Sequence, residues 1–241
     1  MRGLARILLT IVLATLAWGA AAAHADTSLC SNVVAEVPTT ITTPGVWCLT
    51  TDLSYTGFGT AIVIAVDDVV LEMNDHTLAC VVPPSRRACE TGIWAYDRTN
   101  VTVKNGTVRG FPIAVSLNTS DFGPARYRIE AITAVASYIG LFVGGSDSIV
   151  RGCRVSGTTQ VGIEIGRSVA TSVIDNDVRN YTGIGIFMEG SLQNAAVLSN
   201  RLAKGDFGIY FHQTATGKYR DNLTAGVTTK YVGGTDVGNN Q

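Results

Sequence analysis

Two glutamates, a tyrosine and a histidine occur in three successive copies of a repeated sequence pattern: Glu164, Glu189, Tyr210 and His212. A histidine beside a carboxylate can act as a general acid or base near neutral pH, and two carboxylates on one face can hydrolyse a glycosidic bond. Strand spacings predict roughly 8 Å between the Cα atoms of the two glutamates. We therefore treat these four residues as candidate catalytic groups, although a solvated histidine hydrogen-bonded to Glu189 is an equally good interpretation.

Aromatic residues recur at the same places in the pattern, and they suit the binding of sugars. Trp94, Tyr96, Phe142 and Phe187 are the candidate substrate-binding residues. Exposed apolar patches tend to be binding sites, whereas aromatic ladders also stabilise sheets without binding anything. We expect one outward column of Trp94, Ala114, Phe142, Glu164, Phe187 and Tyr210, and a second of Tyr96, Ser116, Gly144, Gly166, Glu189 and His212.

The element that must position these residues is a short strand that returns along the chain. Its copies begin at residues 92, 112, 140, 162, 185 and 208, so the spacings are 20, 28, 22, 23 and 23 residues. A nearly fixed period in this range is typical of a stacked solenoid. Alternation predicts that one set of side chains points inward to form the core: Ile163, Ile165, Ile186, Met188, Ile209 and Phe211.

The segment before these repeats carries a family resemblance. Residues 44–53, 61–64 and 69–78 resemble the right-handed parallel β-helix proteins of the pectate-lyase-like superfamily, with Asp75 where a glycine is usual. The resemblance covers roughly residues 37–225 and implies an all-β, single-stranded right-handed parallel β-helix of about 7–8 coils with an N-terminal cap. This superfamily hosts lyases, hydrolases, epimerases and non-catalytic adhesins, so the fold alone assigns no activity. The calcium-binding aspartate cluster of the lyases and the aspartate motifs of the polygalacturonases are missing from this sequence.

Four segments are expected. Residues 1–25 read as a secretory signal peptide with an Ala-His-Ala cleavage site, residues 26–55 as the cap, residues 56–225 as the β-helix and residues 226–241 as a tail. Without the first 25 residues, 16 basic and 19 acidic residues remain, because Arg2 and Arg6 are lost from the 18 basic ones. This balance excludes a basic nucleic-acid surface, and the mature chain has no apolar run long enough for a membrane span.

Five cysteines follow the proposed cleavage site. Their proximity in sequence predicts two disulfides, Cys30–Cys48 and Cys80–Cys89, which export would permit. Cys153 is left over, and we expect a buried thiol. No C-x-x-C pair occurs, so neither a metal site nor a cofactor is expected.

Three further patterns concern asparagines, a loop and arginines. Asn105, Asn176 and Asn200 are expected to stack as an amide ladder. Residues 118–128 are expected to form a loop insertion on the functional face. Several loop arginines could hold the carboxylates of an acidic polysaccharide: Arg86, Arg87, Arg98, Arg126 and Arg128.

Two classes of function remain open from the sequence. The first is an exported protein that acts on a polysaccharide as a lyase, epimerase or hydrolase. The second is a non-catalytic module, either glycan-binding or structural, that interacts with a partner surface. A polysaccharide or glycan is the expected partner in the leading hypotheses, and the sequence predicts no oligomeric state.

Overall fold

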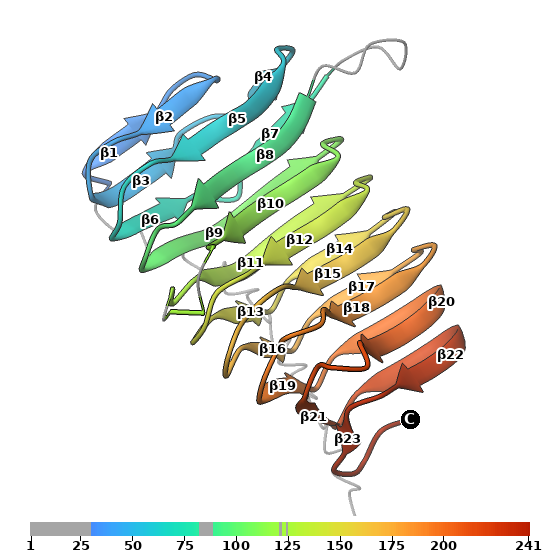
Figure 1. The fold of residues 1–241 in the computed structure, drawn as a ribbon. Coiled ribbons are helices and arrows are strands. Elements are labelled where there is room, and N and C mark those ends of the chain that lie inside the picture. The colour runs from blue at the N-terminus through green and yellow to red at the C-terminus, as the bar shows by residue number, and fades with distance from the viewer. Residues whose placement is uncertain (1–29, 82–88, 121, 124) are drawn as a thin grey trace, which may run out of the picture.

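The computed structural model describes residues 30–81, 89–120, 122–123 and 125–241. These residues form a parallel β-solenoid of about eight coils, in which 23 strands belong to one continuous parallel sheet. Figure 1 shows the coils stacked from β1 to β23, with strands of successive coils side by side. The predicted all-β fold and its resemblance to parallel β-helix proteins are therefore confirmed. Within the described part of the chain, no helix is long and apolar enough to cross a membrane.

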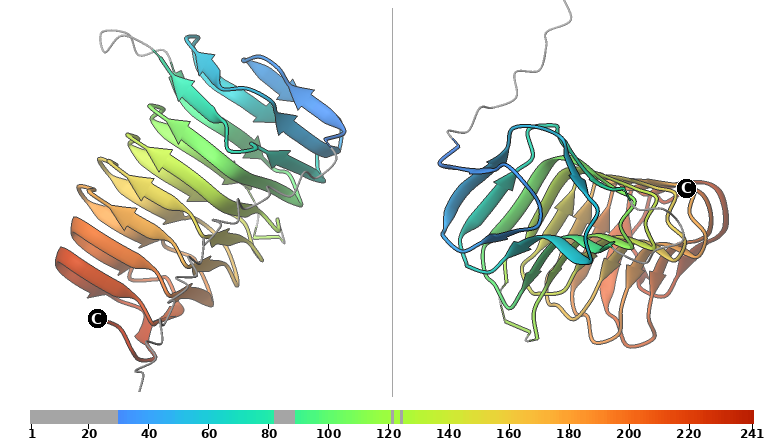
Figure 2. Two further views of the ribbon diagram at one scale, coloured as in Figure 1. Left: turned by 180° about the vertical axis from the view of Figure 1, so that it is seen from behind. Right: turned by 90° about the horizontal axis from the view of Figure 1, so that it is seen from above.

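The strands fall into three stacks, which we call sheets A, B and C (Figures 1 and 2). Sheet A contains β2 (Thr39–Ile41), β5 (Gly59–Ile64), β8 (Cys89–Tyr96), β10 (Ile113–Asn118), β12 (Ile139–Val143), β15 (Val161–Ile165), β18 (Ile184–Met188), and parts of β20 (Arg201–Phe211) and β22 (Leu223–Val232). Sheet B contains β1 (Asn32–Val34), β3 (Gly45–Leu49), β6 (Val69–Glu72), β9 (Val101–Arg109), β11 (Arg128–Val135), β13 (Ile149–Arg151), β16 (Ser172–Ile174), β19 (Ala195–Leu198), β21 (Gly217–Arg220) and β23 (Thr235–Asp236). Sheet C contains β4 (Leu53–Tyr55), β7 (Thr77–Cys80), β14 (Arg154–Ser156), β17 (Asp177–Arg179) and the remaining parts of β9, β11, β20 and β22.

The core is the column of inward side chains that the repeat predicted. All six predicted core residues are buried, with at most 2% of their surface exposed. In sheet A they are register partners from coil to coil, as in the series Ile163, Ile186 and Ile209. Since each coil covers the apolar face of the next, the sheet can consist of strands of only three to six residues in most coils.

A glycine opens most of the repeats, at a point where neighbouring coils lie close together. A Cβ atom added to Gly162 would lie 2.6 Å from the carbonyl oxygen of Gly185, and one added to Gly208 would lie 2.3 Å from that of Lys230. Side-chain carbon atoms do not approach a backbone so closely, so these positions favour a residue without a side chain.

The structure corrects the sequence register in one coil. The copy that we began at Pro112 is displaced by two residues, because Ala114 stands where the other copies have glycine: Ile113 pairs with Thr91 and Val115 with Ile93. Ala114 is therefore buried inside, and Ser116 takes its place in the first outward column, between Trp94 and Phe142. The position that we gave to Ser116 in the second column belongs to Asn118, the partner of Tyr96.

A ladder of buried asparagines runs along the corner between sheets B and C. The Nδ2 of Asn176 donates to the Oδ1 of Asn200 (2.9 Å), and Asn200 donates in the same way to Asn222 (3.0 Å). Asn240 adds a further rung by accepting from the Nδ2 of Asn222 (3.0 Å). The prediction was wrong for Asn105. It occupies the corner position just before that of the ladder asparagines, with a positive φ of 56°, and its side chain donates to Glu72 instead.

Both predicted disulfides are present, Cys30–Cys48 and Cys80–Cys89. Cys153 is a free thiol that is 1% exposed, and burial raises its pKa to about 12. Disulfides of this kind persist in oxidising compartments, in agreement with an exported protein.

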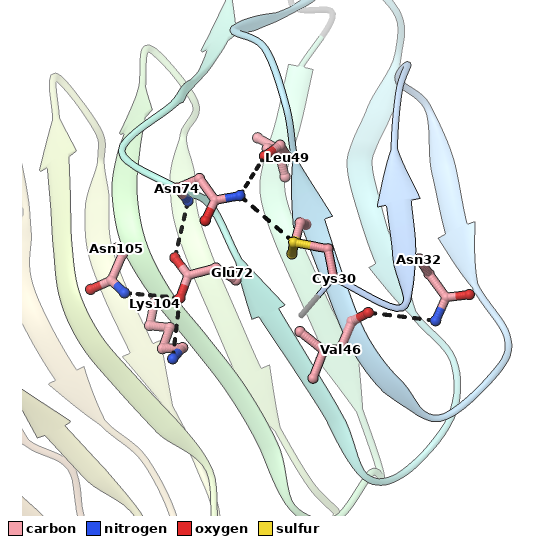
Figure 3. The surroundings of a disulfide bond; sticks show 9 residues. Cys30, Asn32, Val46, Leu49, Glu72, Asn74, Lys104 and Asn105 are labelled. Atoms are coloured by element: carbon pink, nitrogen blue, oxygen red, sulfur yellow. Dashed lines mark hydrogen bonds and ion pairs between the residues drawn. A yellow bond between two sulfur atoms is a disulfide. The ribbon is translucent and has the colours of Figure 1, made fainter. Parts of the chain in front are cut away.

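Glu72 is a buried carboxylate near the first disulfide (Figure 3). It accepts hydrogen bonds from the backbone of Asn74 (3.0 Å) and the side chain of Asn105 (2.9 Å), and it pairs with Lys104 (3.1 Å). The side chain of Asn74 also contacts the sulfur of Cys30 (4.0 Å). Several partners thus offset the cost of burying this charge. Their bonds to Glu72 also hold the first coils together.

Parallel pairing extends beyond the limits expected for the β-helix. Strands β1 to β4, within residues 26–55, already pair with β3, β5, β6 and β7 of the coils that follow. In the expected tail, β22 continues as far as Val232 and pairs with β20, and β23 pairs with β21. The proposed signal peptide and its cleavage after Ala25 lie outside the described residues.

Candidate functional site

The first outward column crosses sheet A without a change of register. Trp94, Ser116, Phe142, Glu164, Phe187 and Tyr210 are consecutive Cα partners on β8, β10, β12, β15, β18 and β20. Neighbouring strands in a sheet are about 4.8 Å apart, so these side chains are direct neighbours along the solenoid. With Ser116 in place of Ala114, the column has the predicted order.

A pocket of about 420 Å³ opens on this face of the molecule. Four of the eight candidate residues line it: Tyr96, Phe142, Glu164 and Glu189. The remaining lining residues were not predicted as site residues: Asn118, Thr119, Ser120 and Arg167. The pocket therefore joins carboxylates, aromatic rings and neutral polar groups from β8, β10, β12, β15 and the corner after β18.

Glycines in the second outward column leave room for the side chains that line the pocket. A Cβ atom on Gly166 would lie 3.1 Å from the ring of Phe142 and 3.2 Å from the Oε2 of Glu189. A Cβ atom on Gly144 would lie 2.2 Å from the Oδ1 of Asn118. The side chain of Glu189 thus extends over Gly166, toward the coil of Glu164.

Glu164 lies in a setting that disfavours its ionised form. Burial raises the pKa of Glu164 to about 7, and the negative charge of Glu189 contributes to the same rise. Burial disfavours the charged form of a carboxyl group, and a like charge nearby disfavours it further. Near neutral pH, Glu164 can therefore hold or release a proton, which is the property that an acid or base catalyst needs.

The raised pKa predicts how stability depends on pH. Because the folded state disfavours ionised Glu164, this residue favours folding at low pH, and that contribution is lost as pH rises from about 4.5 through about 7. Glu164→Gln should therefore raise the melting temperature at pH 8 relative to the parent and change it less at pH 4. Thermal unfolding at both pH values, with the exposed Glu90→Gln as control, measures the difference. An equal shift at both pH values would contradict the assignment.

One wall of the pocket is held by an aspartate on the preceding coil. The Oδ1 of Asp97 accepts hydrogen bonds from the backbone N–H of Ser120 (2.6 Å), its hydroxyl (3.0 Å) and the hydroxyl of Thr119 (3.1 Å). The bond from the Ser120 backbone is the main cause that lowers the pKa of Asp97. The hydroxyl of Tyr127 also donates to the carbonyl of Asn118 (2.8 Å). The start of the predicted loop insertion is thus fixed against β8 and forms part of the site.

The remaining candidate residues flank the pocket. Trp94 stacks on Tyr96, with 5.9 Å between ring centroids, and Phe187 meets Tyr210 edge-on at 5.7 Å. Phe207, which was not predicted, contacts Tyr210 in the same manner at 5.9 Å. Aromatic rings therefore lie on both sides of the pocket, and they are partly exposed.

His212 is exposed, and the register of β18 and β20 makes it the neighbour of Glu189 on the following coil. Its Nδ1 is 3.2 Å from the hydroxyl of Thr214, and its ring lies over Gly190. Because the carboxylate of Glu189 lies over Gly166 instead, the expected side-chain pairing of His212 with Glu189 is not formed. His76 contacts Asp52 (3.3 Å) at another corner.

Of the predicted arginines that the structure describes, Arg98, Arg126 and Arg128 do not line the pocket. The Nε of Arg98 donates to the carbonyl of Tyr96 (3.2 Å), and Arg128 lies 3.8 Å from Glu130. Arg126 is exposed in the loop, and Arg86 and Arg87 lie outside the described residues. The hypothesis that these arginines hold an acidic polysaccharide at this site is therefore not supported by their positions.

One comparison with known proteins assigns a family. Residues 74–240 match the family described as periplasmic copper-binding protein (NosD). Among curated proteins and solved structures, nothing matches the chain at a significant level. The family match spans the coils that carry the pocket.

Proposed function

The chain belongs to the NosD family of periplasmic proteins, and from that premise we propose that it is an exported β-helix protein that binds a glycan in the pocket on sheet A. The observation that carries the proposal is the grouping of Tyr96, Phe142, Glu164 and Glu189 around one pocket. Aromatic rings pack against the apolar faces of sugar rings, while carboxylates and hydroxyls bind their hydroxyl groups. Rings on either side of the pocket extend this surface along the solenoid.

The description of the family also names copper. Proteins bind copper through imidazole, thiolate and thioether groups. In the described residues, no group of three or more histidine, cysteine, aspartate and glutamate side chains could hold a metal ion. Cys153, Met73 and Met188 are buried in the core, and His76 and His212 lie several coils apart. The described residues do not fit a copper site, so our proposal involves no copper.

Truncating the aromatic walls tests glycan binding. Phe142→Ala and Tyr96→Ala should each weaken binding about tenfold or more, because aromatic side chains in a pocket carry much of the binding energy. Their melting temperatures should stay close to that of the parent, since partly exposed side chains contribute little to stability. The measurement is a glycan-array screen followed by calorimetric titration of the best ligand.

Tyr138→Ala is the matched control, because this tyrosine is 51% exposed and lies outside the pocket. It should bind like the parent. If the array detects no ligand, or if the pocket variants bind a detected ligand as the parent does, the proposal is wrong.

Hydrolysis is a second candidate function, favoured by the pKa of about 7 for Glu164 beside Glu189. In this role Glu164 would protonate the glycosidic oxygen, and Glu189 would act as base or nucleophile. Glu164→Gln would then abolish turnover while binding persists, because a proton donor acts mainly in the transition state. If the parent releases no reducing ends from any glycan that it binds, the protein is a binding module.

A further inference from the structure

The pocket has a negative character that restricts which glycans it can accept. Glu164 on β15 and Glu189 after β18 share the space, and after burial the negative charge of Glu189 is the second cause that raises the pKa of Glu164. Arg167 lines the same pocket, but its side chain is exposed, and it does not prevent the rise in the pKa of Glu164. None of the ion pairs in the described part of the chain joins this guanidinium group to Glu164 or Glu189.

The other charged groups near the pocket do not offset this character. Asp97 adds a negative charge behind the wall formed by Thr119 and Ser120. Arg98 is directed to a backbone carbonyl, and the ring of His212 to Thr214. A uronate carboxylate placed in the pocket would therefore meet the negative charge of Glu189, and that of Glu164 once it ionises above about pH 7, which is unfavourable.

A positive charge, by contrast, would be favourable for two reasons. It would pair with Glu189 and relieve the repulsion that adds to the effect of burial on the pKa of Glu164. It would also lie near Tyr96 and Phe142, and the faces of aromatic rings attract cations. The hydroxyl and amide groups of Asn118, Thr119 and Ser120 remain as partners for sugar hydroxyls.

We propose that the glycan taken by this pocket carries protonated amines, as in a chain of de-N-acetylated hexosamines. This inference rests on the proposed glycan binding and names its ligand class. Burial is the larger cause of the raised pKa of Glu164, so an amine beside Glu189 would reduce that shift without abolishing it.

Three matched oligosaccharides of equal length test the inference: oligomers of glucosamine, of N-acetylglucosamine and of galacturonate. Calorimetric titration at slightly acid pH, where the amine is protonated, should show the glucosamine oligomer binding about tenfold more tightly than its acetylated counterpart. This is the difference between a charge-assisted and a neutral hydrogen bond. The galacturonate oligomer should bind most weakly.

Carboxyl-to-amide variants supply the controls. Glu189→Gln should remove most of the preference for the amine, whereas Glu90→Gln makes the same charge change at an exposed residue outside the pocket and should preserve it. An NMR titration gives an independent readout. The glucosamine oligomer should lower the titration midpoint of Glu164 below about 7, and a neutral oligomer should not.

The outcomes separate this inference from the proposed function. If the acetylated and amine forms bind equally and Phe142→Ala weakens both, the pocket binds glycans but the preference for amines is wrong. Tightest binding of the galacturonate oligomer also overturns it. If none of the three binds, the inference is wrong, and the proposed function then depends on the wider glycan array.

Discussion

Replacing Asn200 with alanine should lower the free energy of unfolding by roughly 3–5 kcal/mol, because several buried polar groups lose partners at once. The Oδ1 of Asn200 accepts from the backbone N–H (3.0 Å) and the Nδ2 (2.9 Å) of Asn176, and its own Nδ2 donates to the carbonyl of Val173 (2.9 Å). Asn200 and Asn176 are each 1% exposed, so water cannot easily replace these bonds. Urea denaturation of the variant and the parent measures the loss.

Asn240→Ala is the control at the last observed rung. It also removes an acceptor of Asn222, but Asn240 is half-buried, so water can take over its bonds and the loss should be smaller. Equal losses for the two variants would mean that the stability of the ladder does not come from satisfying buried amides.

Ile186→Ala should cost about 2–5 kcal/mol, the usual range for truncating a large side chain in a packed core. Ile186 is fully buried on β18 and has Ile163 and Ile209 as its register partners on the neighbouring coils. The cavity would lie between three coils whose backbones are held by continuous ladders of hydrogen bonds, so little collapse can fill it. Chemical denaturation followed by circular dichroism measures the change.

Ile184→Ala makes the same substitution two residues earlier on β18, at a half-buried position. It should cost clearly less than Ile186→Ala, since less apolar surface returns to water. A cost below about 0.5 kcal/mol for Ile186→Ala would contradict the packing described above.

The period of the glycine-led strands was sufficient to predict a stacked solenoid, because stacking constrains the same position in every coil, whereas the parallel β-helix was implied by the family resemblance. Gly162 and Gly208 each face a backbone carbonyl of the next coil. Glycine therefore recurs at this position because a side chain would collide with that carbonyl. The same argument explains the one register error. Ala114 replaces the glycine in its coil, so the nearby Pro112 was mistaken for the start of the repeat.

The site was only partly predictable for a related reason. Glu164 and Phe142 lie on strands, where alternation determines the direction of a side chain. Thr119 and Ser120 lie after β10, and their positions depend on hydrogen bonds to Asp97 that have no period. Arg167 likewise follows the end of β15 at a corner. The pocket residues at the corners therefore required the structure, whereas those on the strands followed from the repeat.

The asparagine ladder has a direction, and this direction bears on how the chain reaches its fold. The backbone N–H of Cys153 donates to the side chain of Asn176, that of Asn176 to Asn200, and that of Asn200 to Asn222. Each corner amide is thus satisfied by the coil that follows it in the sequence. A chain that emerges N-terminus first, whether from the ribosome or across a membrane, leaves its newest corner without an acceptor until another coil is added. Completion of the β-helix therefore proceeds one coil behind the emerging chain, and the growing end is the point at which a pause in synthesis or export leaves buried amides unpaired.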